Sequence, residues 1–290
     1  MRKILLLSGL VGMAVVSKAQ DSDLLSLIDS GEQKKEYITN AFKSTRVING
    51  HSMEFLGKGV LDVRILHRFG TVKSGFNNLF GLDQASMRFG FDYGLGKSVT
   101  VGFGRSNVNK EWDGFIKWRP LWQSTGPRSS PVSVVLVAGA TYTTQPQSGD
   151  QKRTTTSRMA FYHELIVGRK FNDRFSMQVA PVFVHRNMVP TLEEEHDVWA
   201  LGVGARFKLT NRLALVADYH HVVKGLDKDL YKNPLSIGLD IETGGHVFQL
   251  HFSNATGMNE KAFITNTTDS WGKAEIRFGF NLSRVFTIGK

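Results

Sequence analysis

The chain has 290 residues, 21% of them charged, a formal net charge of +10 and no cysteine. The lack of cysteine excludes disulfide staples, thiol catalysis, thiolate metal sites and standard c-type haem attachment. Its basic residues stand singly within extended segments rather than in blocks, which argues against nucleic-acid binding.

Residues 1–19 have the features of a secretory signal. Arg2 and Lys3 precede an apolar run at residues 4–16, and a small-x-small triplet ends at Ala19. This order predicts export and cleavage, and it fits a buried N-terminal helix less well. Without this segment, 33 basic residues stand against 26 acidic ones. The most apolar later run, residues 132–140, has the length of a strand rather than of a membrane helix.

Residues 20–58 differ in composition from the rest of the chain. A leucine-rich cluster at residues 24–28 follows Asp21, which predicts a short helix. Residues 43–48 and 52–56 are extended pieces on either side of an Asn-Gly pair, a strong hairpin signal. Both pieces are short for membrane-spanning strands. We therefore expect a periplasmic segment or a plug inside the protein, with an extra hairpin as an alternative.

Regular alternation of apolar and polar residues begins at residue 59. At residues 84–95, for example, Phe89 and Phe91 share one face and Arg88 and Asp92 share the other. Side chains of a strand alternate between its two faces, so each segment has one apolar and one polar face. Twelve strands are predicted, at residues 59–70, 84–95, 98–106, 112–121, 132–143, 158–170, 174–186, 197–209, 212–222, 235–242, 246–254 and 273–282.

Twelve such strands predict an all-β fold, an antiparallel transmembrane β-barrel with an apolar exterior and a polar lumen. Tight turns and long polar loops alternate, as in bacterial outer-membrane barrels, and an even strand number brings both termini to the periplasm. Fourteen strands, with the Asn-Gly hairpin included, would keep the same parity. The expected organisation is a signal at residues 1–19, an N-terminal segment at 20–58 and a barrel at 59–290.

Two runs of sequence carry a family resemblance. They are TRVINGHSMEFLGKGVLDVRILHRFG, residues 45–70, and GGHVFQLHFSNATGMNEKAFIT, residues 244–265. They resemble membrane-bound β-barrel domain proteins of unknown function from Gram-negative bacteria of the Bacteroides–Flavobacterium type. The resemblance covers nearly all of the mature chain. It implies an outer-membrane barrel and assigns no catalytic or binding residue.

The polar faces supply the first candidate site, which is the lumen. Charges inside a barrel must be paired or hydrated, so they form either a salt-bridge lattice or a path for small polar solutes. The lumen-lining candidates are Asp62, Arg64, Arg88, Asp92, Lys117, Arg119, Glu164, Arg206, Asp218, His220, Asp240, Glu242, His251, Glu275 and Arg277.

Two further groups have weaker signals. Carboxylates and a histidine in one loop offer ligands for calcium or another cation, although acidic loops are usually only solvated. Inward histidines beside carboxylates could also bind a metal, but no motif supports this and no cofactor is expected. Outward His163 with nearby Ser157 suggests a lipid hydrolase, without an acyl-transfer motif around them. The loop candidates are Glu193, Glu194, Glu195, His196 and Asp197.

The sequence therefore predicts a non-enzymatic outer-membrane barrel, either a narrow polar channel or a structural or accessory component. Its partners are expected to be outer-membrane lipid, small polar solutes and a protein of the same membrane. The alternatives are a barrel enzyme acting on lipid and a soluble exported β-sandwich that binds a ligand. A sandwich would show the same alternation but would not need detergent to stay dissolved.

Overall fold

The computed structural model describes residues 34–146, 154–191, 193–244 and 246–288. The predicted signal and the predicted helix at residues 24–28 lie outside the described residues. None of the helices in the described ranges is both long and apolar enough to cross a membrane.

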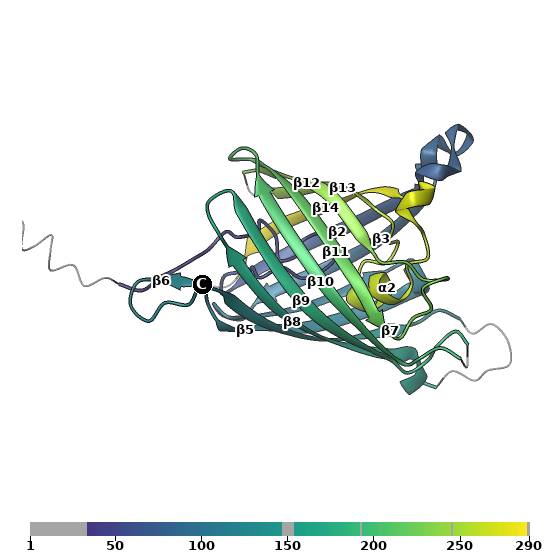
Figure 1. Cartoon of the computed structure of the whole chain (residues 1–290), viewed down its shortest axis with the longest axis horizontal. Coiled ribbons are helices and arrows are strands. Elements are labelled where there is room, and N and C mark those ends of the chain that lie inside the picture. Colours follow the sequence, from purple (N-terminus) through teal and green to yellow (C-terminus); the bar gives the residue numbers. More distant parts are fainter. Residues whose placement is uncertain (1–33, 147–153, 192, 245, 289–290) are drawn as a thin grey trace, which may run out of the picture.

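Twelve antiparallel strands close into a barrel (Figure 1). Each strand pairs with its neighbours in the chain, apart from the short strand β6, and β14 pairs with β2 to close the sheet. The strands are β2 (Val60–Thr71), β3 (Ala85–Gly94), β4 (Val99–Ser106), β5 (Glu111–Leu121), β7 (Ser133–Thr143), β8 (Met159–Lys170), β9 (Phe175–Arg186), β10 (Asp197–Lys208), β11 (Leu213–Lys224), β12 (Leu235–Thr243), β13 (His246–Ser253) and β14 (Arg277–Thr287).

The predicted antiparallel barrel of twelve strands is confirmed. Most strand ends differ from the prediction by one or two residues, because the alternation is regular until each turn. The exception is the last strand, which was expected at residues 273–282 and runs from Arg277 to Thr287. A short 3-10 helix, η5 (Trp271–Lys273), precedes it, and Ala274 takes a left-handed conformation with φ of 56°. This local turn delays entry into the sheet.

Among the described residues, few other elements lie outside the barrel sheet. Strands β1 (Glu36–Tyr37) and β6 (Ser124–Thr125) pair at the turn end of the barrel. The loop end carries one short α-helix, α2 (Glu260–Thr265). Four further 3-10 turns lie in the loops, η1 (Val72–Ser74), η2 (Phe76–Gly81), η3 (Val108–Lys110) and η4 (Thr156–Arg158).

The outer face of the barrel is apolar, as the alternation predicts. Phe103, Ile116 and Leu136 are among the large hydrophobic side chains exposed on it. The inward neighbours of Ile116 and Leu136 are buried within the barrel. Exposed apolar side chains along spanning strands are stable only against acyl chains, so the geometry fits a membrane environment.

Two segments fold into the lumen and meet there. The first, residues 40–56, is called the plug; it enters from the turn end, and most of it is buried. The second, residues 254–267, is called the cap; it contains α2 and enters from the loop end (Figure 1). The plug therefore fills a barrel of twelve strands instead of adding a thirteenth and a fourteenth.

The inner wall has two chemically different parts. Strands β7 to β10 present buried aliphatic side chains inward, including Val135, Ile166, Val182 and Val198, which form one cluster with plug and cap residues. Most of the other strands present charged, polar or glycine residues inward, whereas β11 combines Asp218 and His220 with aliphatic side chains. Inward aliphatic residues are unsuited to a water-filled pore, so this part of the wall is a packed core.

Candidate functional site

The Asn-Gly turn of the plug lies on a carboxylate of the barrel wall. Val47 N donates to Gly50 O at 2.9 Å, which closes the turn. Oδ2 of Asp218, on β11, accepts the backbone N–H groups of Ile48, Asn49 and Gly50 at 3.3, 2.7 and 2.9 Å. Three amides converging on one oxygen form an anion-binding concavity. The Asn-Gly pair therefore lies in a tight turn flanked by an isolated bridge between Arg46 and His51, and Asp218 holds this turn against the wall.

Amide side chains of the wall hold the plug backbone on either side of this turn. Gln178 on β9 accepts Met53 N at 2.9 Å and donates to His51 O at 2.6 Å. Gln249 on β13 donates to Val47 O at 2.5 Å, and Asn281 on β14 donates to Ile48 O at 3.1 Å. These contacts replace the strand pairing that the short plug lacks. Buried backbone groups are thereby satisfied.

Basic side chains of the wall bind hydroxyl and carbonyl oxygen atoms of the plug. Nη1 of Arg64 donates to Ser44 Oγ at 2.8 Å and to Thr45 Oγ1 at 2.6 Å. Nζ of Lys117 donates to the carbonyl oxygens of Glu54 at 2.7 Å and Thr45 at 3.3 Å. Arg64 and Lys117 therefore bind the plug and do not form a lattice of ion pairs between strands.

The cap is anchored by its own helix. Asn259 caps α2, because its Oδ1 accepts Ala262 N at 2.8 Å. Buried Glu111, at the start of β5, accepts Asn259 Nδ2 at 3.1 Å and Lys261 Nζ at 2.9 Å. Phe263 packs edge-on against the ring of His220, with ring centroids 4.8 Å apart. One ion pair and one aromatic contact thus fix the cap to opposite strands.

The plug and the cap are joined by a buried ion pair. Nη1 of Arg46 lies 2.6 Å from Glu260 Oε1, and both side chains are 1% exposed. His51 Nε2 lies 3.4 Å from the same oxygen, and its ring packs against Phe115. Burial and the adjacent Arg46 guanidinium hold the pKa of His51 well below its usual range, so this histidine is neutral. The two segments together block the barrel between its mouths.

A cavity of about 240 Å³ lies between the plug and the wall at the turn end. Glu54 lines it and accepts the backbone N–H groups of Ala41 and Phe42 at 2.5 and 3.2 Å. Burial raises the pKa of this carboxyl, while these two N–H groups act to lower it. Lys43 pairs with Glu242 at 2.6 Å across the same mouth. Both polar and apolar side chains line this cavity at the turn-end mouth.

Most of the predicted lumen-lining residues are buried inside the barrel. Whether they serve solute passage stays a prediction, since the structure shows them beneath the plug and the cap. The twelve buried residues are Asp62, Arg64, Arg88, Asp92, Lys117, Arg119, Glu164, Arg206, Asp218, His220, Asp240 and His251. Arg88 pairs with Asp113 on β5 at 2.5 Å, one of the few ion pairs that join two strands.

The other three predicted lumen residues lie at the two mouths. Glu242 is at the turn end, and Arg277 pairs with Asp269 at the loop end. The placement of Glu275 on a lumen-facing strand was wrong. It precedes β14, and its carboxylate accepts a hydrogen bond from Lys73 of the η1 loop at 2.7 Å. The late start of β14 is the reason.

The carboxylates of the acidic loop between β9 and β10 pair with different basic side chains. Glu194 pairs with Arg186 at 3.3 Å, and Glu195 lies 3.5 Å from Lys224. Asp197 pairs with His185 at 2.6 Å. These contacts do not bring the five predicted cation ligands together in one site. The five residues are Glu193, Glu194, Glu195, His196 and Asp197. Cation binding by this loop stays a prediction.

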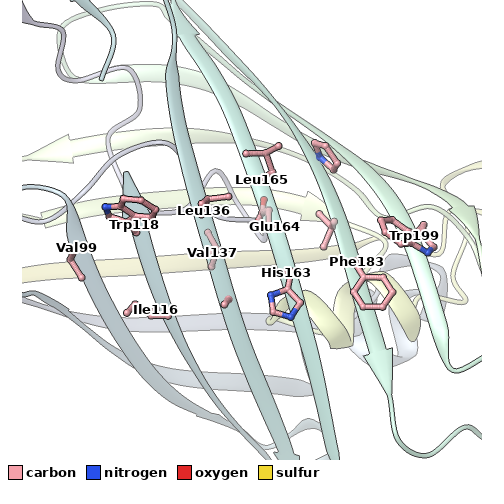
Figure 2. A pocket seen from close by; sticks show the side chains of 13 residues that line it. Val99, Ile116, Trp118, Leu136, Val137, His163, Glu164, Leu165, Phe183 and Trp199 are labelled. Atoms are coloured by element: carbon pink, nitrogen blue, oxygen red, sulfur yellow. The ribbon is translucent and has the colours of Figure 1, made fainter. Parts of the chain in front are cut away.

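An apolar groove lies on the outer face across β4 to β10 (Figure 2). His163 lies in it among Trp118, Phe183 and Trp199, whereas its neighbour Glu164 belongs to the inner face. The described residues that line the groove include no serine or threonine. Ser157 lies in η4, and its hydroxyl donates to Thr154 O at 2.9 Å. The predicted serine and histidine are therefore not brought together around the groove.

Sequence patterns missed the residues that join the plug and the cap to each other and to the wall. Arg46 and His51 come from the plug, Glu111 from β5 and Glu260 from the cap, and no local spacing links these three segments. One signal was available, because the inward positions of β7 to β9 are aliphatic rather than polar. That break in the polar lumen predicts an internal packing partner.

Comparisons with solved structures found barrels at low sequence identity. KdgM porin matches with a TM-score of 0.49 and 8% identity, covering 78% of this chain and 99% of that one. NanC porin matches with a TM-score of 0.48 and 7% identity, covering 79% and 100%. Outer membrane phospholipase A from Escherichia coli matches with a TM-score of 0.43 and 11% identity, covering 83% and 96%. Comparison with curated proteins found no match.

The family comparison gives a more specific result. Residues 42–286 match the model of a membrane-bound β-barrel domain, DUF5777. This range includes nearly all of the plug and the twelve barrel strands apart from the last residue of β14. The match confirms the predicted family and membrane location, and a closed antiparallel barrel is the architecture of the bacterial outer membrane. The chain therefore belongs to the family of membrane-bound β-barrel domain proteins.

Proposed function

We propose that the protein is a non-enzymatic outer-membrane barrel that is closed at rest and passes small polar solutes when the plug is displaced. In this proposal residues 1–19 are an export signal and residues 20–58 are the plug segment. The observation that carries it is the seating of the plug turn on Asp218. Hydrogen bonds of this kind can be exchanged for water, which would leave a polar wall facing the path.

The test is a conductance measurement on the full chain in planar bilayers. We expect the wild-type protein to be mostly silent and Asp218→Ala to open far more often, with weak ion selectivity because charges of both signs line the wall. Uptake of small sugars into liposomes should rise in the same order. A wild-type channel that conducts steadily would contradict a plug that closes the barrel.

A structural or accessory role in the outer membrane is the second candidate. The aliphatic inner wall of β7 to β10 favours it, because plug and cap pack there as in a protein core. In that case Asp218→Ala would not conduct, even when its plug becomes accessible to reagents. A protein partner in the same membrane would then be sought by crosslinking.

We also propose that the outer groove has no esterase activity. An esterase needs a nucleophile within hydrogen-bond reach of its base, and the described groove lining around His163 holds no hydroxyl side chain. We expect no phospholipid hydrolysis above the detergent blank. Hydrolysis that is lost in His163→Ala would overturn this part of the proposal.

A further inference from the structure

Three ligand-type side chains meet at the junction of plug, wall and cap. His51 comes from the plug, Glu164 from β8 and Glu260 from α2. Their candidate ligand atoms all lie within 4.8 Å of one another. The residues are 1%, 3% and 1% exposed. Within the described ranges, no other group of three or more histidine and acidic residues has its ligand atoms this close together.

Each of the three residues keeps a buried polar atom without a hydrogen-bond partner. These atoms are His51 Nδ1, Glu164 Oε2 and Glu260 Oε2. Buried polar atoms in folded proteins are nearly always paired, and an orphaned one indicates a water or an ion. Three orphaned atoms from three separate elements in one cluster indicate a shared occupant.

The charges in contact favour a cation. Arg46 and Lys117 are the nearest cationic side chains, and of the two carboxylates only Glu260 forms an ion pair among the described residues, with Arg46 Nη1 lying 2.6 Å from its Oε1. Arg46 Nη2 also lies 3.4 Å from His51 Nε2. This pairing occupies one oxygen of Glu260 and leaves the other unpartnered. A divalent cation bound on that side would balance the remaining negative charge and replace the missing partners.

We propose that His51, Glu164 and Glu260 form a site for a divalent cation of the zinc class, which fastens the plug and the cap to the wall. One imidazole nitrogen and two carboxylate oxygens are ligands that zinc accepts, with a fourth position open to water. Calcium requires six to eight oxygen ligands, which this cluster does not offer. The site does not depend on whether the barrel conducts.

The test uses the full chain purified in detergent, stripped with a chelator and incubated with Zn²⁺. We expect one zinc per chain after desalting, measured by inductively coupled plasma mass spectrometry. His51→Ala and Glu164→Gln should each weaken zinc binding at least tenfold in competition with a chromogenic chelator. Glu275→Gln makes the same chemical change in the outer loop and should bind like the wild type. Calcium should not be retained.

Two results would overturn the proposal. The wild type could retain no zinc, which would leave water or the Arg46 ion pair as the explanation of the cluster. Alternatively, both variants could retain zinc as the wild type does, which would place the metal elsewhere. If a variant fails to fold, X-ray absorption at the zinc edge of the wild type decides. A first shell with one imidazole supports the site, and a shell of water oxygens alone refutes it.

Discussion

Replacing Asp218 with alanine should unseat the plug while leaving the barrel intact. Asp218 is 2% exposed and lies on β11, which pairs with β10 and β12 through its backbone. The carboxylate is therefore dispensable for the sheet. Its removal leaves the amides of Ile48, Asn49 and Gly50 without their shared acceptor.

The size of the effect follows from these contacts. A hydrogen bond to a charged group contributes roughly 1.5–3 kcal/mol. Two of the three contacts are at normal length, 2.7 and 2.9 Å, and the third is long at 3.3 Å. Because such contacts are not additive, we take about 3 kcal/mol for the set. That value corresponds to an increase of about a hundredfold in the population with the plug displaced.

The natural absence of cysteine provides the assay. Ser52→Cys places a single thiol on the plug at a position that is fully buried. The rate of maleimide labelling then reports how often the plug leaves its seat. We expect Asp218→Ala to raise that rate about a hundredfold and to raise the open probability in bilayers. Heat-modifiable migration in detergent gels shows that the barrel is still folded.

The matched control is Asp173→Ala, which removes an exposed carboxylate from the turn between β8 and β9. Its labelling rate should equal that of the parent. If folded Asp218→Ala labels no faster than Asp173→Ala, the plug is not held by this carboxylate and the reasoning fails. Fast labelling without conductance would instead support the structural role.

Three further predictions use other parts of the molecule. Gly204→Val should expel the plug, since even a Cβ at this position would lie 2.8 Å from Val47 Cγ2; unchanged labelling of the plug thiol would contradict this. Ile116→Arg should cost the barrel about 2–4 kcal/mol in urea titrations with vesicles, because it puts a charge on the lipid face, whereas Ile116→Leu should cost little. The plug should loosen as the pH rises through the raised pKa of Glu54, because the protonated carboxyl is the form favoured in the seated plug. The contribution of Glu54 to holding the plug is complete below pH 4.5 and is lost as the carboxyl ionises. Glu54→Gln should remove that dependence of the labelling rate on pH.

Residues on the barrel strands were predictable because the signal is local. Phe89 and Phe91 face outward and Arg88 and Asp92 face inward, as the period of two requires. The bounds of β14 were misjudged at both ends, and a left-handed residue at Ala274 delays its start. The Asn-Gly turn was also readable, since its geometry depends on neighbouring residues alone.

What fills the lumen was not predictable from such patterns. Arg46 and Glu260 are 214 positions apart, and Gly50 and Asp218 are 168 apart. Their pairing depends on which strands face each other after closure of the sheet. Glu164 illustrates the difference, because its inward direction follows from alternation, whereas its place beside His51 and Glu260 does not.

The sequence by itself determined the order of the barrel strands and the face that each side chain occupies, because alternation is a property of adjacent residues. It left twelve and fourteen strands open, and only the closed sheet decided for twelve. The tertiary structure alone decided that the lumen is filled, since plug and cap enter from opposite ends and meet through contacts between distant segments. Charges that could have lined an open path instead bind the backbone of the plug. Burial makes an unpaired charge costly, and the plug supplies the partners that water would otherwise provide.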